Sequence, residues 1–193
     1  MAQAATKRGE RYTYAEYLQW PGDERWELVD GVAYNMTPAP TRRHQDISRE
    51  LLTLFSVHLR GKKCKVYDAP FDVRLPASGE TDETTSTVVQ PDLVVVCDPA
   101  KLDERGCKGA PDLVIEILSP DSIARDLKEK LLLYERAGVL EYWVVYPAEK
   151  MVMVFRSGED GAYGRPATYL SEDRVTVGVL PELEIELGRV FAE

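Results

Sequence analysis

At 193 residues, with 44% hydrophobic and 30% charged side chains, the chain has the size of one globular domain over residues 1–193, and no apolar run approaches the roughly 20 residues that cross a bilayer. The formal net charge of −9 opposes non-specific attraction to a polyanion, which counts against a dedicated nucleic-acid binder but not against an enzyme with a carboxylate-lined metal site. A polar N-terminus without an apolar signal segment predicts a cytoplasmic protein.

The N-terminal part of the sequence predicts a short helix followed by a hairpin. A capping-box pattern begins the helix, which we expect over about residues 14–20. Strands at 25–29 and 32–36 flank Asp30-Gly31, a dipeptide suited to a tight primed turn. Glu27 lies in the middle of the first of these strands, on the face opposite to its two apolar neighbours.

The next elements are one long helix and two short strands. Apolar residues recur at near-helical spacing over 41–60, with His44 close to the helix start. From there His44 could reach a site, although a histidine in that position is more often a surface or capping residue. Short strands are predicted at 65–67 and 71–75, and 76–87 is a polar loop.

Two apolar runs predict strands that are buried on both faces, as in the centre of a sheet. The first covers 88–97 and is interrupted by Pro91, and the second covers 113–118. Proline cannot donate to a strand ladder, so it marks an edge, a bulge or a strand start, and the backbone at Asp92 is expected to be special. Residues 98–109 between the runs form a charged connector.

The C-terminal half continues as a helix and several strands, which completes an α/β pattern. The helix is expected over 123–137 and ends at Gly138, a typical C-terminal residue. The strands that follow are predicted at 141–146, 151–155, 167–170, 175–180 and 183–187.

Glu116 is the strongest anomaly, because an ionisable residue with aliphatic neighbours on both sides lies in a predicted interior strand. Burying an unpaired carboxylate is costly, so a partner is required. On the following helix, at about 100° per residue, Lys130 lies near the middle of the apolar stripe, whereas Lys128 and Glu129 point away. We therefore expect Glu116 and Lys130 to meet. A structural ion pair alone would explain them; a catalytic site needs further carboxylates.

Two carboxylates compete for the place beside Glu116. Asp112 precedes it by four residues on the same strand, which separates the two by about 13 Å at ~3.3 Å per residue, too far to share one small metal ion. Asp92, on a separate strand, has no such limit, so we prefer Asp92 and expect Asp112 to cap or begin its strand. Glu27 is a weaker fourth candidate, since a solvated sheet face would also explain it.

The three cysteines are Cys64, Cys97 and Cys107, and they contain no Cys-x-x-Cys pair. With two histidines in the chain, they provide no zinc-ligand set. Reduced, buried or chemically idle thiols are the expected state.

Five separated blocks together resemble the Uma2 family, long known as a domain of unknown function and placed in the PD-(D/E)XK, or restriction-endonuclease-like, superfamily. The resemblance covers about residues 12–155 and leaves 156–193 as a C-terminal β extension. The blocks are Trp26-Glu27-Leu28-Val29-Asp30-Gly31, Pro91-Asp92-Leu93-Val94, Pro111-Asp112-Leu113-Val114-Ile115-Glu116-Ile117-Leu118-Ser119-Pro120, Asp126-Leu127-Lys128-Glu129-Lys130 to Tyr134, and Ala137-Gly138-Val139-Leu140-Glu141-Tyr142-Trp143-Val144.

The resemblance implies a restriction-endonuclease-like core, a mixed β-sheet flanked by helices, with a divalent metal site, hydrolysis of DNA and a homodimer. Asp92 corresponds to the Pro-Asp carboxylate and Glu116 to the second acidic residue. The superfamily lysine stands two residues after that acid, where this sequence has Leu118. In Uma2-like chains the following helix supplies this lysine, which fits Lys130.

The sequence thus predicts an endonuclease that depends on Mg²⁺ or Mn²⁺ and acts on DNA. Asp92 and Glu116 would hold the metal, and Glu27 and Lys130 would complete the catalytic set. One alternative is a catalytically silent homodimeric interaction domain in which Glu116 and Lys130 form only a buried ion pair. Another is a metal-dependent hydrolase of a small phosphorylated substrate.

Overall fold

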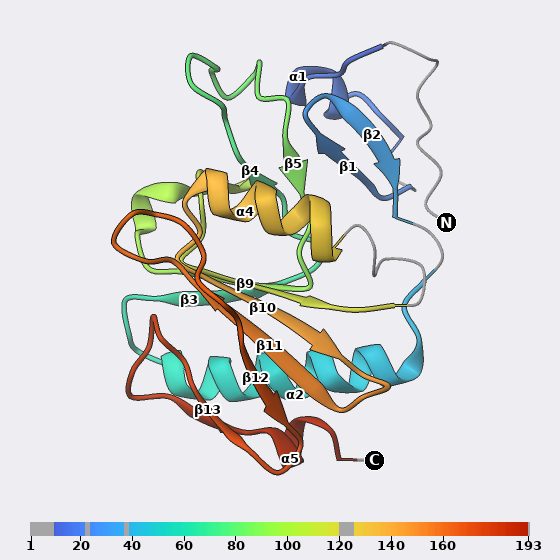
Figure 1. Ribbon diagram of the computed structural model, residues 1–193. Helices are drawn as coiled ribbons and strands as arrows, with labels where there is room; N and C mark the ends of the chain where they lie inside the picture. Colours follow the sequence, from blue (N-terminus) through green and yellow to red (C-terminus); the bar gives the residue numbers. More distant parts are fainter. Residues whose placement is uncertain (1–9, 22–23, 37–38, 120–125, 193) are drawn as a thin grey trace.

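The computed structural model describes residues 10–21, 24–36, 39–119 and 126–192 (Figure 1). Its larger sheet has the strand order β12-β11-β10-β9-β6-β3. β9 and β10 run parallel, and the other neighbours in this sheet are antiparallel, so the sheet is mixed as predicted. Its strands are β3 (Lys65–Asp68), β6 (Leu93–Val96), β9 (Leu113–Ile117), β10 (Glu141–Tyr146), β11 (Met151–Arg156) and β12 (Ala167–Leu170).

Helices cover both faces of the larger sheet (Figure 1). The long helix α2 (Arg42–Leu59) packs its apolar face on one side, and α4 (Leu131–Ala137) covers the other. Because side chains alternate along a strand, Leu93 of β6 belongs to the α2-side core and Val94 to the α4-side core. None of the helices in the described ranges is long and apolar enough to cross a membrane.

The C-terminal segment packs on the same side of the sheet as α2. It forms the antiparallel pair β13 (Arg174–Thr176) and β14 (Glu184–Glu186), followed by the short helix α5 (Leu187–Val190). Buried Val175 and Ile185 join the α2-side core. Both predicted strands are present but shorter than expected, and the chain turns helical at the end of β14.

A second, smaller sheet is built from short strands in the order β2-β1-β5-β4-β8-β7. The prediction that 98–109 is only a connector was wrong, because it contains the β7–β8 hairpin, which pairs in parallel with β4. The elements of this part are α1 (Tyr14–Tyr17), β1 (Trp26–Val29), β2 (Val32–Asn35), β4 (Val73–Arg74), β5 (Val88–Val89), the 3₁₀ turn η1 (Pro99–Lys101), β7 (Leu102–Asp103) and β8 (Gly106–Lys108).

The chain passes from the smaller sheet to the larger one at Pro91. The single apolar run predicted over 88–97 is two strands, β5 in the smaller sheet and β6 in the larger. Proline has no N–H for a ladder, so the pairing pattern changes there. This crossing carries the chain directly from the neighbourhood of β1, which holds Glu27, to Asp92.

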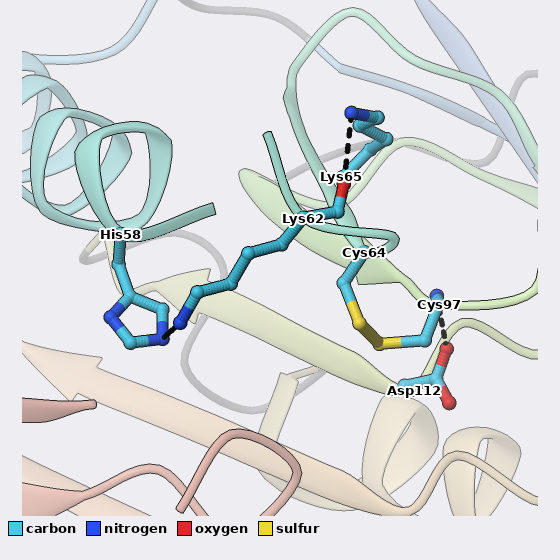
Figure 2. Close-up of a disulfide and its surroundings, with 6 residues drawn as sticks. All are labelled: His58, Lys62, Cys64, Lys65, Cys97 and Asp112. Carbon is cyan, nitrogen blue, oxygen red and sulfur yellow. Dashed lines mark hydrogen bonds between the residues drawn. A yellow bond between two sulfur atoms is a disulfide. The ribbon is translucent and has the colours of Figure 1, made fainter. Parts of the chain in front are cut away.

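The expectation of three unlinked thiols was wrong for two of them: Cys64 and Cys97 form a disulfide (Figure 2). The cause lies in the strand register, because β3 and β6 pair Lys65 with Val96, and the next positions outward are the two cysteines. Cys107 is a free, buried thiol. Burial raises its pKa to about 11, so it is protonated near neutral pH.

This arrangement predicts a specific alkylation count. Treated with iodoacetamide at pH 8 without reductant, the folded protein should remain unmodified, because the thiolate is the reactive form and Cys107 is buried and protonated. Denaturation without reductant should expose one reactive cysteine, and denaturation with reductant three. Intact-mass spectrometry reads these counts, and three modifications without reductant would show that Cys64 and Cys97 are not linked.

Candidate active site

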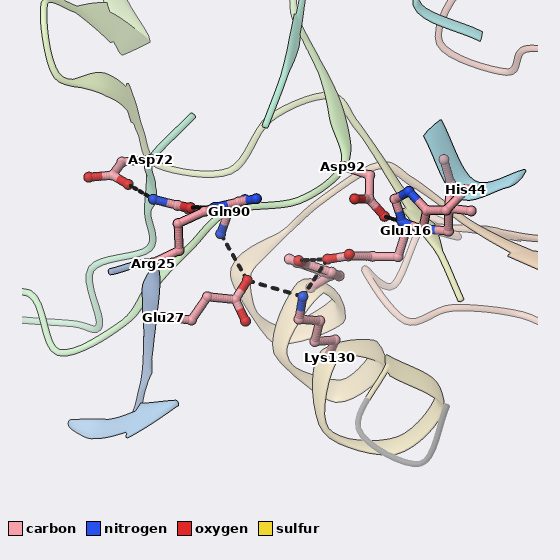
Figure 3. Close-up of polar contacts among 10 residues, drawn as sticks. Arg25, Glu27, His44, Asp72, Gln90, Asp92, Glu116 and Lys130 are labelled. Carbon is pink, nitrogen blue, oxygen red and sulfur yellow. Dashed lines mark hydrogen bonds and ion pairs between the residues drawn. The ribbon is translucent and has the colours of Figure 1, made fainter. Parts of the chain in front are cut away.

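The structure brings three of the four predicted site residues into direct contact. Lys130 Nζ lies 2.7 Å from Glu116 Oε1 and 3.1 Å from Glu27 Oε1 (Figure 3). The three residues are 3%, 5% and 0% exposed, in that order. They come from a helical turn, the larger sheet and the smaller sheet, so the cluster forms where these parts of the fold meet.

Lys130 is supplied by a widened helical turn. A π-helical turn, η2 (Asp126–Lys130), leads directly into α4. Such turns occur often at functional positions. Lys128 and Glu129 are exposed as the helical pattern predicted. The first residues of the expected helix, 123–125, lie outside the described part of the chain, and the expected helix end at Gly138 is confirmed.

Tyr134, one helical turn after Lys130, also contacts Glu116. Its hydroxyl donates to Glu116 Oε1 over 2.7 Å, so that oxygen accepts from both side chains. Burial, together with the nearby Glu116 and Glu27 carboxylates, raises the pKa of Tyr134 well above its ordinary value, and the phenol is a neutral donor. Its place on the same helical stripe as Lys130 was a signal that could have included it in the predicted site.

Asp92 lies beside Glu116. The antiparallel register pairs Leu93 with Ile115, so the next positions, Asp92 and Glu116, face each other across neighbouring strands. Asp92 Oδ2 accepts a hydrogen bond from the backbone N–H of Ile117 over 2.7 Å. The carboxylate is therefore fixed against the strand that carries Glu116, with its side chain 21% exposed (Figure 3).

Asp112 does not contact Glu116 and instead accepts a hydrogen bond from the backbone beside β9. Its Oδ2 accepts from the backbone N–H of Cys97 over 2.7 Å, near the start of β9 and away from Glu116. This is the strand-capping position expected for it. The geometry thus supports the choice of Asp92 over Asp112, and the catalytic roles of the site residues stay predictions.

His44 is a residue that the sequence left undecided and the structure brings to the site. It stands in the first turn of α2, where Thr41 Oγ1 accepts from its backbone N–H. Its ring Nε2 lies 3.1 Å from Asp92 Oδ2, and the imidazole is 12% exposed (Figure 3). Asp92 is therefore held from two sides, by the strand backbone and by the histidine.

Among the described residues, no three or more His, Cys, Asp or Glu side chains gather into a ready-made metal-ligand set. Magnesium does not require one, since it is commonly held by one or two carboxylates and keeps several waters or binds substrate phosphates. Asp92 and Glu116, facing each other on adjacent strands, meet that smaller requirement with hard oxygen ligands. The donor set fits a divalent oxygen-seeking cation better than zinc, which prefers cysteine and histidine.

Comparison with known sequences identifies the family. The Uma2 family model, described as "Putative restriction endonuclease", matches residues 14–188. The chain belongs to the Uma2 family. The match runs past residue 155, where the resemblance seen in the sequence ended, so the residues of β12, β13 and β14 in this Uma2 protein lie within the matched range.

Two relatives illustrate the range of the likeness. The uncharacterized protein slr1290 of Synechocystis sp. is 31% identical over 149 residues, which cover 76% of this chain and 74% of that protein. A crystal structure from Anabaena variabilis, described as a "putative nuclease belonging to DUF820", superposes with a TM-score of 0.74 at 21% identity, over 94% of this chain and 98% of that one. At this identity the likeness establishes the fold, and it confirms the predicted mixed sheet flanked by helices.

Leu118 is a buried core residue. It stands two residues after Glu116, where the superfamily lysine is expected, and it is buried in the α4-side core. Its backbone N–H donates to Val145 O. The ammonium that contacts Glu116 comes instead from Lys130.

Proposed function

We propose that this Uma2 protein is a divalent-metal-dependent endonuclease that hydrolyses phosphodiester bonds of DNA. The observation that carries the proposal is the meeting of three acidic residues and one lysine where the two sheets join. Lys130 Nζ contacts Glu27 Oε1 and Glu116 Oε1, and Asp92 lies beside Glu116, just before β6. A structural ion pair needs one carboxylate for one lysine, whereas Asp92 beside Glu116 offers a divalent cation two carboxylate ligands.

Each site residue has a proposed role that agrees with its contacts. Asp92 and Glu116 would hold Mg²⁺ or Mn²⁺, which when bound lowers the pKa of a coordinated water and offsets charge on the phosphate. Lys130 would orient the attacking water or contact the scissile phosphate, and Glu27 keeps its ammonium in place. Tyr134 fixes the rotation of the Glu116 carboxylate by donating to the same oxygen as Lys130.

We also propose that the substrate is DNA and that the enzyme is a homodimer in the cytoplasm. The family description names a restriction endonuclease, which is the support for a nucleic acid. Because the chain carries a net charge of −9, contact with phosphates should depend on the metal more than on surface lysines. In a dimer, two such sites would cut both strands of a duplex.

The same net charge favours a second candidate, a catalytically silent homodimeric interaction domain that retains the nuclease fold. In that case Lys130 serves only to neutralise the buried Glu27 and Glu116. The two candidates differ in metal binding, because a silent domain needs no cation.

Metal binding is tested first by thermal unfolding of the wild type and Asp92→Asn. The substitution keeps an oxygen acceptor for Ile117 and His44 but removes the charge. At a metal concentration of about 100 times Kd, Mg²⁺ or Mn²⁺ should raise the wild-type melting temperature by about 5–10 °C, and Asp92→Asn should lose this shift. The matched control is Asp68→Asn, an exposed aspartate on neighbouring β3.

Cleavage is tested with the same proteins on single-stranded, double-stranded and branched DNA in Mg²⁺ or Mn²⁺. Wild type and Asp68→Asn should cut, and Asp92→Asn should not. A wild-type protein that neither cuts any of these substrates nor gains stability from either metal would refute the enzyme and leave the interaction domain. Cleavage that survives Asp92→Asn at the wild-type rate would move the active site elsewhere.

A further inference from the structure

A second polar cluster lies beside the site, next to Glu27, and its central residue is Gln90 (Figure 3). Its side-chain Oε1 accepts from Arg25 Nε over 3.1 Å. Its Nε2 donates to Asp72 Oδ1 over 2.9 Å and to the Tyr17 hydroxyl over 3.1 Å. Tyr17 in turn donates to Asp72 Oδ1 over 3.1 Å. Gln90 is 7% exposed, so these bonds replace water almost completely.

The backbone of Gln90 connects this cluster to the site. Its N–H donates over 2.9 Å to Glu27 Oε1, the oxygen that also accepts from Lys130. Two residues further along is Asp92, across Pro91, whose ring fixes one backbone angle. Gln90 thus lies in the link between β5 of the smaller sheet and β6 of the larger one. Its backbone contacts Glu27 on one side of the site, and the chain reaches Asp92 on the other side two residues later.

We propose that Gln90 is a positioning residue, whose clamped side chain sets the placement of Asp92 relative to Glu27 and Lys130. The inference rests on the proposed function for its catalytic meaning. The three partners of the Gln90 amide come from separate segments: Arg25 lies before β1, Asp72 before β4 and Tyr17 at the end of α1. They therefore fix the amide from three directions. A shift of that amide would move the Gln90–Asp92 segment as a unit.

The pattern of bonds explains why the residue is a glutamine. The position requires an acceptor toward Arg25 and, at the same time, a donor toward Asp72, which an amide alone supplies. A carboxylate would meet Asp72 at hydrogen-bond distance as a like charge. Burial raises the pKa of Asp72, and the bonds donated by Gln90 and Tyr17 counteract that rise, so Asp72 depends on its donors.

A pair of exchanged substitutions tests this donor and acceptor pattern. Gln90→Glu keeps the size and the acceptor for Arg25 but places two carboxylates together. The double variant Gln90→Glu/Asp72→Asn exchanges donor and acceptor, so the new amide at 72 can donate to the new carboxylate at 90. Gln19→Glu, an exposed glutamine in the same part of the chain, controls for the added charge.

The first readout needs neither metal nor activity. The backbone N–H of Ile117 is bonded to Asp92 Oδ2, so its hydrogen exchange, measured by NMR in metal-free protein, reports on the position of Asp92. Gln90→Glu should speed this exchange about tenfold, the double variant should return it to within about threefold of wild type, and Gln19→Glu should leave it unchanged. Unaltered Ile117 exchange in Gln90→Glu would overturn the positioning role, whatever its effect on the melting temperature.

The second readout is Mn²⁺ affinity, measured by titration well below the melting temperature. Residues that orient metal ligands commonly change affinity about 10–100-fold, so we expect a loss of that size in Gln90→Glu and recovery in the double variant. A wild type that binds no metal refutes the proposed function alone, since the exchange experiment still decides on Gln90. Metal affinity that is unchanged in Gln90→Glu would contradict the inference.

Discussion

Replacing Lys130 with methionine should lower the free energy of unfolding by about 3–5 kcal/mol. The ammonium is 3% exposed and lies between Glu27 and Glu116, which are 0% and 5% exposed. Methionine fills a similar volume but removes the positive charge that contacts both buried carboxylates, so the ammonium no longer offsets their desolvation cost. Urea denaturation followed by circular dichroism measures the change.

Two further variants show whether the loss of stability comes from the buried position of Lys130 and its two carboxylate partners. Lys128→Met removes an exposed lysine from the same helical turn and should cost less than about 0.5 kcal/mol. The triple variant Glu27→Gln/Glu116→Gln/Lys130→Met removes the three charges together and should recover most of the lost stability, because neither glutamate is then left charged without the ammonium. A loss below about 1 kcal/mol for Lys130→Met alone would mean that water reaches the carboxylates.

Replacing Glu116 with glutamine should lower metal-dependent DNA cleavage at least about 100-fold while leaving the protein folded. Residues that merely orient a metal ligand contribute 10–100-fold, so a direct ligand should lie at or beyond the upper end of that range. The fold survives because the amide oxygen can still accept from Tyr134 and Lys130. Initial cleavage rates at fixed Mg²⁺ measure the loss of activity, and the melting temperature shows whether the protein remains folded.

The matched control for this substitution is Glu129→Gln, an exposed glutamate on the turn that supplies Lys130. It should cut at the wild-type rate. Equal rates for wild type and Glu116→Gln would show that the metal does not rely on Glu116. Slow cleavage accompanied by unfolding would instead assign Glu116 a structural role.

Features that depend on neighbouring residues were predictable from the sequence. The hairpin turn forms at Asp30-Gly31, where both residues have positive φ, as a primed turn requires. The contact between Glu116 and Lys130 followed from a strand face and a helical stripe, each defined within a few residues. Local periodicity decides which side of an element a residue occupies, and this was enough to find the centre of the site.

Features that depend on distant partners were not predictable in this way. The β7–β8 hairpin is a strand pair because β4 lies beside it, and its own sequence reads as a charged loop. The disulfide requires the register between β3 and β6, which the spacing of cysteines does not reveal. The contact between His44 and Asp92 depends on how α2 is set against the sheet, and no local pattern encodes that.

The passage of the chain between the two sheets at Pro91 also affects when the site forms during folding. Glu27 belongs to the smaller sheet and Lys130 to the helix above the larger one, and their contact spans 103 residues of sequence. Contacts of such long range form late in folding, after loop closure has been completed. A chain still emerging from the ribosome, or one with only one sheet formed, therefore lacks the cluster. The contact between Glu27 and Lys130 therefore exists only in the molecule in which both sheets have formed.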